Sequence, residues 1–506
     1  MRTAHCLFFG AFFSAAAANA VAGTYKDDIG YTRLYQALNG NVANGAGVNV
    51  IQVEASTSAT SNQIKPDPAN AAFSKITFHL PADSNAAVSS HATGVGQIFY
   101  GASSTSNGIK TVDVYSVNSW LNAIGAPSVV NPPDSARVVN NSWVGAADNA
   151  QDSASILSVL DRLADRRDLI DVAAMNNSAT TWPLLADLFN AITVGRSDGH
   201  QDTGTHPVNA PYNTARTAPD LVAPNAYTSD STPMVASAAA MLTSLGHADG
   251  LTLSKGVTQV AGVGQVYDAE QEVTIKAALM AGADRSTNNA SYAYNVQNYR
   301  AAGYATANGL DSRYGAGQLD EFNSYEILLG GEHKSVQAGN TGDIGQYGFD
   351  YAKSFATNGN NFATYRFTDG SATQFAATLA WDLTFTSDSA QTGVLRNLDL
   401  SLFDVTRGIF TEVSKSAVDN TQNIWASLTP GDKYQLQVTV GDNQNVSVGY
   451  ALAWRFNSAS VSATPKLAYL DSFSRQEFIA TPLPNCGFAG FAVLLGWLVR
   501  RGRGKV

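Results

Sequence analysis

The stretch ASILSVLDRLADRRDLIDVAA (154–174) contains the pattern that decides the fold. Apolar residues in its first part recur at helical spacing: Ile156, Leu157, Leu160 and Leu163. This spacing predicts an amphipathic helix over 154–167. The second part, 168–174, is a short apolar run of the kind found in strands that are buried on both faces. A helix followed at once by such a strand is typical of parallel α/β sheets.

The same alternation continues on both sides of this stretch. Strands are predicted at GVNVIQVEA (47–55) and NAITVG (190–195), and helical runs lie between the strands. Residues 24–335 therefore predict an α/β domain, with a parallel sheet flanked by helices on both faces.

Beyond residue 340 the sequence changes to short β-branched or aromatic runs that are separated by turn-forming clusters. The runs are ATYRFT (363–368), FAATLAWDLTFT (375–386), LDLSLFDV (398–405), YQLQVTV (434–440) and VSVGYALAWRF (446–456). This pattern predicts an antiparallel β-sandwich over 340–457. A linker is predicted over 458–480.

Composition excludes several classes of function. The chain has 506 residues and a net charge of -10, with no block of Lys or Arg in its body, so no nucleic-acid partner is expected. The two cysteines, Cys6 and Cys486, lie near the ends, which leaves no thiol nucleophile, disulfide or cysteine-based zinc site in the body. The histidines outside the motif described below show no metal-ligand spacing, so no metal is expected.

Both ends carry targeting patterns. Residues 1–22 combine Arg2, an apolar run and small residues at Ala18-Asn19-Ala20, which predicts an export signal. Residues 481–506 combine a Pro-containing entry, an apolar run and a basic end, TPLPNCGFAGFAVLLGWLVRRGRGKV. This segment resembles the exosortase-type C-terminal sorting signals of Gram-negative bacteria, and a plain membrane anchor is the alternative. The run is shorter than the ~20 residues that span a bilayer.

Four segments in the α/β region carry groups suited to acyl transfer. They are GVNVIQVEAS (47–56), SSHATGVGQIFYG (89–101), DVAAMNNSA (171–179) and APDLVAPNAYTSDSTPMVASAAAML (218–242). A serine hydroxyl becomes a nucleophile when a histidine takes its proton, and a carboxylate on the far ring nitrogen fixes the tautomer. An amide donor and a helix N-terminus stabilise the oxyanion. Pro233 is expected in the first turn of the helix that carries the serine.

These segments resemble the subtilisin family of serine peptidases. The second matches the family's H-G-T-x-V-A-G block and the fourth its G-T-S-x-A-x-P block, which implies His91 as general base and Ser229 as nucleophile. The third matches V-A-A-G-N, which implies Asn176 as the oxyanion donor. The first matches G-V-x-V-A-V-I-D, with Glu54 as the acid. The chain order acid, His, Ser is that of subtilisins.

Three positions depart from the family pattern. Glu54 replaces the usual Asp, and Met175 and Tyr227 replace glycines that, in the family, border the pocket for the residue before the scissile bond. The resemblance implies substrate-binding roles for Met175 and Tyr227, with a narrowed pocket. An inactive binding or scaffold protein on a subtilisin fold, at the cell surface, is the alternative that these departures keep open.

The resemblance thus predicts an exported serine endopeptidase that acts on protein or peptide substrates. We expect a monomer in the cell envelope or outside the cell, with membrane contact only through the C-terminal segment. Calcium is frequent in subtilisins, but no loop here indicates a site, so no cofactor is expected.

Overall fold

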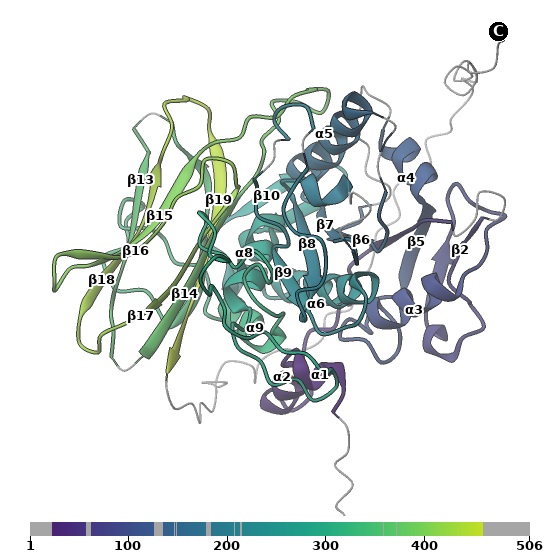
Figure 1. The fold of residues 1–506 in the computed structure, drawn as a ribbon, viewed down its shortest axis with the longest axis horizontal. Helices are drawn as coiled ribbons and strands as arrows, with labels where there is room; N and C mark the ends of the chain where they lie inside the picture. Colours follow the sequence, from purple (N-terminus) through teal and green to yellow (C-terminus); the bar gives the residue numbers. More distant parts are fainter. Residues whose placement is uncertain are drawn as a thin grey trace, which may run out of the picture. The chain divides into compact units, whose positions relative to one another are not determined.

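A computed structural model shows a parallel sheet in the N-terminal part of the chain and a pair of antiparallel sheets after it (Figure 1). It describes residues 23–56, 62–125, 135–145, 147, 149–178, 184–206, 208–212, 215–357, 359–370 and 372–458. The predicted export signal (1–22) and C-terminal segment (481–506) lie outside the described residues, as does the predicted linker beyond residue 458.

Seven strands form the first sheet, and every neighbouring pair is parallel. Their order is β3 (Thr77–His79), β5 (Thr111–Ser116), β1 (Val50–Glu54), β6 (Val138–Asn141), β7 (Ile170–Ala174), β8 (Ala191–Arg196) and β9 (Leu221–Ala223). The chain leaves β1 toward β3 and β5 and later continues on the other side with β6. This reversal makes the carboxyl end of β1 a switch point, where α/β sheets commonly bind ligands.

Helices cover both faces of this sheet. The helices in this part of the described chain are α1 (Tyr25–Asp28), α2 (Tyr31–Ala37), α3 (Ser90–Phe99), α4 (Val117–Ile124), α5 (Ala150–Arg167), α6 (Thr228–Ala248), α7 (Gly250–Leu253), α8 (Glu272–Gly282) and α9 (Glu321–Leu329). Trp120 of α4 and Leu157 of α5 share a core with Val53 of β1. On the other face, α6 contacts β6, β7 and β8 and packs against α3. Smaller strand pairs are β2 (Gln63–Lys65) with β4 (Ala87–Val88) and β10 (Val257–Val260) with β11 (Gly264–Tyr267).

The predicted helix over 154–167 is the C-terminal part of α5. This helix begins earlier than predicted, at Ala150, because Asn149 caps it by accepting a 3.0 Å hydrogen bond from the backbone N–H of Asp152. It ends where Asp168 takes the left-handed conformation, with φ of 53°. Leu157, Leu160 and Leu163 are buried, as the spacing predicts.

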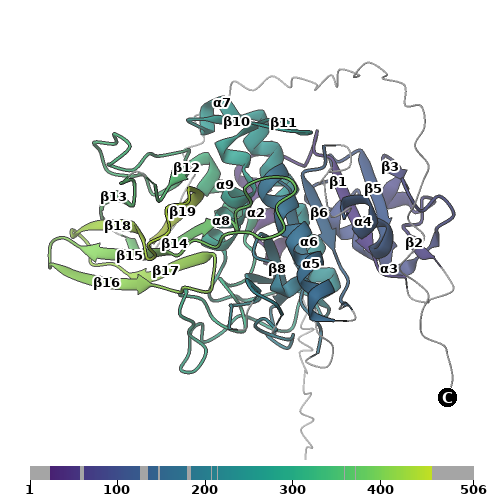
Figure 2. The ribbon, with the colours of Figure 1, turned by 90° about the horizontal axis from the view of Figure 1, so that it is seen from above.

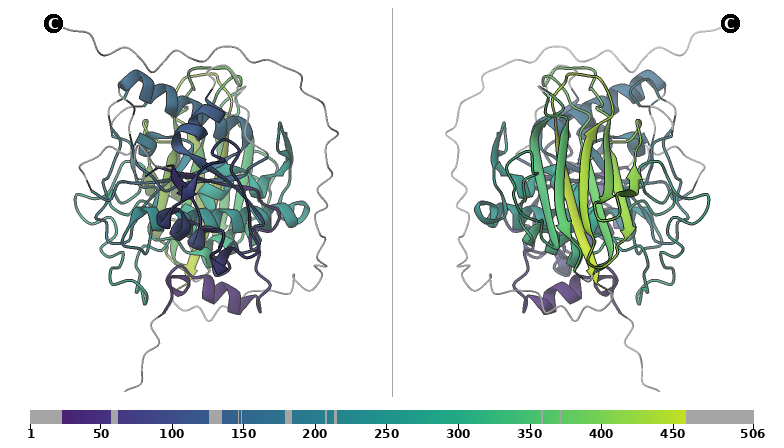
Figure 3. Two further views of the ribbon diagram at one scale, coloured as in Figure 1. Left: turned by 90° about the vertical axis from the view of Figure 1, so that its right-hand side faces the viewer. Right: turned by 90° about the vertical axis from the view of Figure 1, so that its left-hand side faces the viewer.

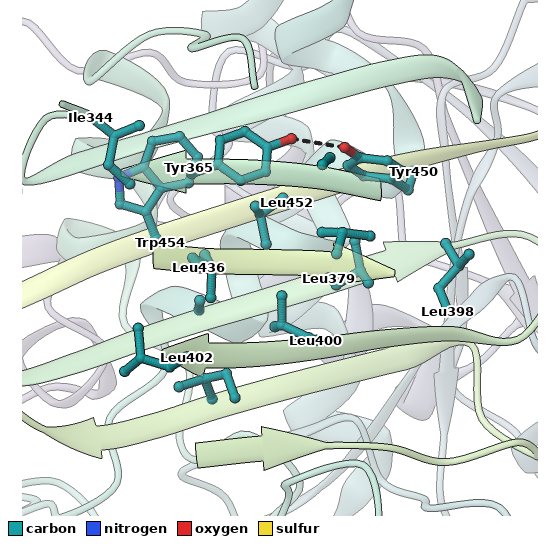
Figure 4. Packing of buried hydrophobic residues seen from close by; sticks show 14 of the residues in the cluster. Ile344, Tyr365, Leu379, Leu398, Leu400, Leu402, Leu436, Tyr450, Leu452 and Trp454 are labelled. Carbon is teal, nitrogen blue, oxygen red and sulfur yellow. Dashed lines mark hydrogen bonds between the residues drawn. The ribbon is translucent and has the colours of Figure 1, made fainter. Parts of the chain in front are cut away.

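The second part of the fold is a sandwich of two four-stranded antiparallel sheets. One has the order β12 (Tyr347–Phe355), β19 (Val448–Ser458), β14 (Ala372–Trp381), β17 (Thr421–Ser427), and the other β13 (Phe362–Thr368), β18 (Lys433–Val440), β15 (Leu398–Asp404), β16 (Ile409–Ser414). Figure 3 shows these strands lying side by side. Alternate residues face inward and form one core, which includes Leu379, Leu400, Leu436 and Leu452 (Figure 4). Trp381 and Trp454 are fully buried in it.

Helix α8 joins the two parts. It contacts α6 on one side and strands β14 and β19 on the other, and Figure 2 shows it between the parallel sheet and the sandwich. The sandwich face that it contacts carries small side chains, Ala376 and Ala380 on β14 and Ala451 and Ala453 on β19, all of them buried. Small residues allow a close approach of helix and sheet.

The predicted fold class is confirmed: an α/β unit with a helix-flanked parallel sheet is followed by an antiparallel β-sandwich. Within the described residues, no helix is both long and apolar enough to cross a membrane.

Candidate active site

Strand β1 presents Glu54 at the carboxyl end of the sheet. Alternation along the strand places Gln52 and Glu54 on one face and Ile51 and Val53 on the other, where they join the core with Trp120. Glu54 is 1% exposed. A buried carboxylate requires a partner, and His91 provides one.

His91 is the second residue of α3. Ser89 caps this helix by accepting a 3.2 Å hydrogen bond from the backbone N–H of Ala92. The His91 Nδ1 atom lies 2.8 Å from Glu54 Oε2. A carboxylate only accepts hydrogen bonds, so Nδ1–H is the donor and Nε2 is left as the basic atom in the neutral ring. The His91 side chain is 39% exposed, which leaves part of the ring accessible.

Charge around His91 raises its pKa. The hydrogen bond that His91 donates to Glu54 is the largest cause; partial burial of the ring opposes it, and the negative charges of Glu54 and Asp230 add to it. Asp230, the residue after Ser229, is thus one of the charged groups that influence His91. Burial raises the pKa of Asp230, and the nearby His91 partly offsets this.

Ser229 is the second residue of α6 and is half-buried. The structure brings Glu54 and His91 into direct contact, and α6 packs against α3. Within the described part of the chain, Ser229 Oγ makes no hydrogen bond, so the structure does not form the contact between nucleophile and base. Such contacts are often long in active sites without substrate.

Pro233 lies deeper in α6 than the sequence predicts. It is the sixth residue of the helix, not part of the first turn. Proline has no backbone N–H, so the carbonyl of Ser229, four residues earlier, loses its usual helical donor. The Thr232 hydroxyl donates a 2.7 Å hydrogen bond to the carbonyl of Thr228, the residue before Ser229.

Two asparagines follow β7. The predicted oxyanion donor, Asn176, is 7% exposed, and its backbone carbonyl accepts a 2.9 Å hydrogen bond from the N–H of Asp202. Asn177 Oδ1 accepts a 2.9 Å hydrogen bond from the backbone N–H of Thr228. Tyr227, the residue before α6, makes no capping bond with its side chain, so Asn177 satisfies this N–H from another element. Sequence reasoning did not assign this role to Asn177.

The two predicted substrate-binding residues have different surroundings. Tyr227 is 59% exposed and immediately precedes α6. Met175 is fully buried and packs with Ala186 and Ala218. The Met175 side chain has no exposed surface, so it can affect a substrate only by shaping the wall of the pocket. Both pocket roles, like those of Ser229 and Asn176, stay predictions.

Across the residues that the structure describes, no group of three or more His, Cys, Asp or Glu side chains is arranged to hold a metal ion.

The chain matches no family profile and no curated protein. Among solved structures, PatG macrocyclase in complex with peptide aligns at 12% identity over 58% of this chain and 95% of its own length, with a TM-score of 0.37. The pre-peptidase C-terminal domain of a collagenase from Bacillus anthracis aligns at 16% identity over 21% of this chain and 87% of its own, with a TM-score of 0.17. Similarities of this size assign neither a family nor an activity to the chain.

Proposed function

We propose that this chain is a subtilisin-like serine endopeptidase that is exported through its N-terminal segment. Ser229 is the nucleophile, His91 the general base and Glu54 the acid that orients His91. The observation that carries the proposal is the 2.8 Å contact between Glu54 Oε2 and His91 Nδ1, since His91 belongs to α3 and this helix packs against the helix that carries Ser229. The position of this contact at the switch point of the sheet supports it.

The proposed reaction has two halves. Ser229 Oγ attacks the carbonyl carbon of the scissile peptide bond while its proton passes to His91 Nε2. Glu54 stays ionised and stabilises the imidazolium, while the Asn176 amide and the N-terminal end of α6 stabilise the oxyanion. His91 then protonates the leaving amine, and the C–N bond breaks to give an acyl-enzyme. In the second half, His91 deprotonates a water molecule that hydrolyses the ester and restores Ser229.

A fluorophosphonate probe tests the nucleophile, because it reacts with activated serines. We expect the folded wild-type protein to be labelled and Ser229→Ala to remain unlabelled. Glu54→Gln should slow labelling by roughly 10³–10⁴, by analogy with the loss seen when a triad aspartate becomes an amide. Ser90→Ala is the matched control, since this exposed serine is next to His91 but has no role in the proposal.

The alternative is an inactive binding or scaffold protein on the same fold. The residues that favour it are Met175 and Tyr227, which stand where the resemblance expects glycine. Absence of labelling in folded wild-type protein, or equal labelling of Ser229→Ala, would replace the peptidase proposal with this one. Retention at the cell envelope through 481–506 is a separate part of the proposal, and mass spectrometry of the mature protein tests it.

A further inference from the structure

A series of buried hydrogen bonds ends at Oε1 of Glu54, the carboxylate oxygen that does not bind His91. Gln52 Nε2 donates to Glu54 Oε1 at 2.6 Å and to the backbone carbonyl of Ala92 at 2.9 Å. Gln52 Oε1 accepts a hydrogen bond from the hydroxyl of Tyr100. Gln52 and Tyr100 are fully buried. Because buried polar groups are costly without partners, each group in this series depends on the next.

The chemistry of the partners fixes the orientation of the Gln52 amide. The carboxylate of Glu54 and the carbonyl of Ala92 only accept hydrogen bonds, so the NH₂ group of Gln52 must face them. Its carbonyl then faces Tyr100. Each oxygen of Glu54 has its own donor, Gln52 for Oε1 and His91 for Oε2. This pair of donors determines the plane of the carboxylate.

Tyr100 is itself held by packing. Its ring lies 5.6 Å from that of Phe73, 6.0 Å from that of Phe78 and 5.5 Å from that of Phe99, measured between ring centroids. Gly96 lies one helical turn earlier, and a Cβ atom there would be 2.5 Å from the Tyr100 hydroxyl. Glycine at 96 therefore leaves the space that the hydroxyl needs to reach Gln52.

We propose that Gln52 and Tyr100 are positioning residues for the triad acid, a step that rests on the proposed function. Glutamate has one more rotatable bond than the aspartate that the family pattern carries, so a free Glu54 would present its carboxylate to His91 in several orientations. Gln52 removes this freedom by binding Oε1, and Tyr100 holds Gln52.

Gln52→Met tests the proposal, because methionine has a similar shape and no hydrogen-bonding amide. We expect kcat/KM for a peptide substrate to fall by about 10–100-fold, because a slight misplacement of a catalytic group has an effect of this size. The loss should lie in kcat and not in KM. The same substitution in a Glu54→Gln background should change kcat/KM by less than about twofold, because residues that act through one another are not additive. Tyr100→Phe should give a smaller loss of the same kind.

Two further measurements separate positioning from general stability. Tyr365→Phe is the matched control, since the buried Tyr365 hydroxyl donates to Asp350 at 2.5 Å in the sandwich core; it should lower the urea midpoint and leave kcat/KM unchanged. The proton NMR signal of the His91 Nδ1–H should shift upfield or broaden in Gln52→Met.

The outcomes distinguish the two proposals. An unchanged Nδ1–H signal in folded Gln52→Met, or equal losses of kcat/KM in both backgrounds, would overturn the positioning role. The NMR measurement needs no activity, so it decides this role even if Ser229 proves unreactive.

Discussion

At the scale of single residues, the negative charge of Asp230 affects the protonation of His91. Asp230 stands directly after Ser229 and is one of the causes that raise the pKa of His91. A negative charge favours the imidazolium, whereas His91 has to be neutral to act as the general base of the proposed mechanism. Activity should therefore be lost as the pH falls through the raised pKa of His91.

Removal of this charge gives a prediction with a definite sign. Asp230→Asn should lower the pKa of His91 and move the acid limb of the profile of kcat/KM against pH to lower pH. Labelling rates across pH, together with NMR titration of the His91 ring, measure the change. Asp343→Asn is the control, because Asp343 contacts Thr368 in the sandwich region and not the site. An acid limb that stays in place or moves to higher pH would contradict the assigned influence of Asp230.

Some residue contacts could be predicted from sequence and others could not. The pairing of Glu54 with His91 could be predicted, because both occur in recognisable segments in a fixed order. The role of Gln52 was missed, although a polar residue inside a buried strand is a signal for an internal partner. The motif assigns the oxyanion role to Asn176, and it contains no signal that the adjacent Asn177 binds the start of α6. Which of the two faces α6 depends on backbone geometry.

At the scale of elements, the start of α6 depends on another strand. The N–H of Thr228 is satisfied by Asn177 from the segment after β7, so β7 and α6 are joined next to Ser229. Sequence patterns predicted the apolar strands well, for example β7 from the run 168–174. They missed β12, β16 and β17. In β17, TQNIWAS (421–427) is largely polar, and its buried amides find partners far along the chain: Gln422 donates to the carbonyl of Leu398 and Asn423 to that of Asn308.

Asn177→Ala tests the joint between these two elements. The lost cap should reduce the free energy of unfolding by about 1 kcal/mol, and the rate of Ser229 labelling should fall because the start of the helix is released. Asn149→Ala is the matched control, since it removes a similar cap from α5. It should cost similar stability, measured by urea unfolding, without slowing the labelling. Equal effects on labelling in both variants would show that Asn177 has no local role at the site.

At the scale of the whole described chain, buried polar groups join the sandwich to the α/β unit. Arg455 of β19 donates to the carbonyls of Ala281 and Ala283 at the end of α8, both at 2.9 Å. Asn190 exchanges two hydrogen bonds with the backbone of Leu383, at 3.0 and 2.8 Å. Sequence alone could not predict this interface, because its partners are far apart in the chain. These contacts hold the sandwich against the α/β unit.

Acidic groups at the same interface make its stability depend on pH. Burial, followed by the charge of Asp268, raises the pKa of Glu332 to about 8, and burial raises the pKa of Asp350 in β12 to about 7. Asp268 lies on the α/β side, and the positive groups near it are Lys334 and Lys353. The folded protein therefore keeps these protons at pH values where the unfolded chain has already released them.

The sign of the resulting dependence follows from linkage. The folded state binds more protons than the unfolded state between the ordinary carboxyl pKa, near 4.5 for Glu332, and its raised value of about 8. The free energy of unfolding should thus fall as pH rises through this window. Each unit of pKa difference corresponds to about 1.4 kcal/mol. Glu332→Gln should flatten the decline, measured by urea unfolding at pH 5 and pH 9, because a neutral amide has no proton to lose.

Glu412→Gln is the matched control for this interface. Glu412 pairs with Arg300 at 2.7 Å, and the side chains of both residues remain partly exposed. Its substitution should leave the slope of stability against pH unchanged. If both variants show the same slope of unfolding free energy against pH as the wild type, Glu332 does not make the stability of this interface depend on pH. A flatter slope in Glu332→Gln alone would show that deprotonation of Glu332 contributes to the loss of stability in alkaline solution.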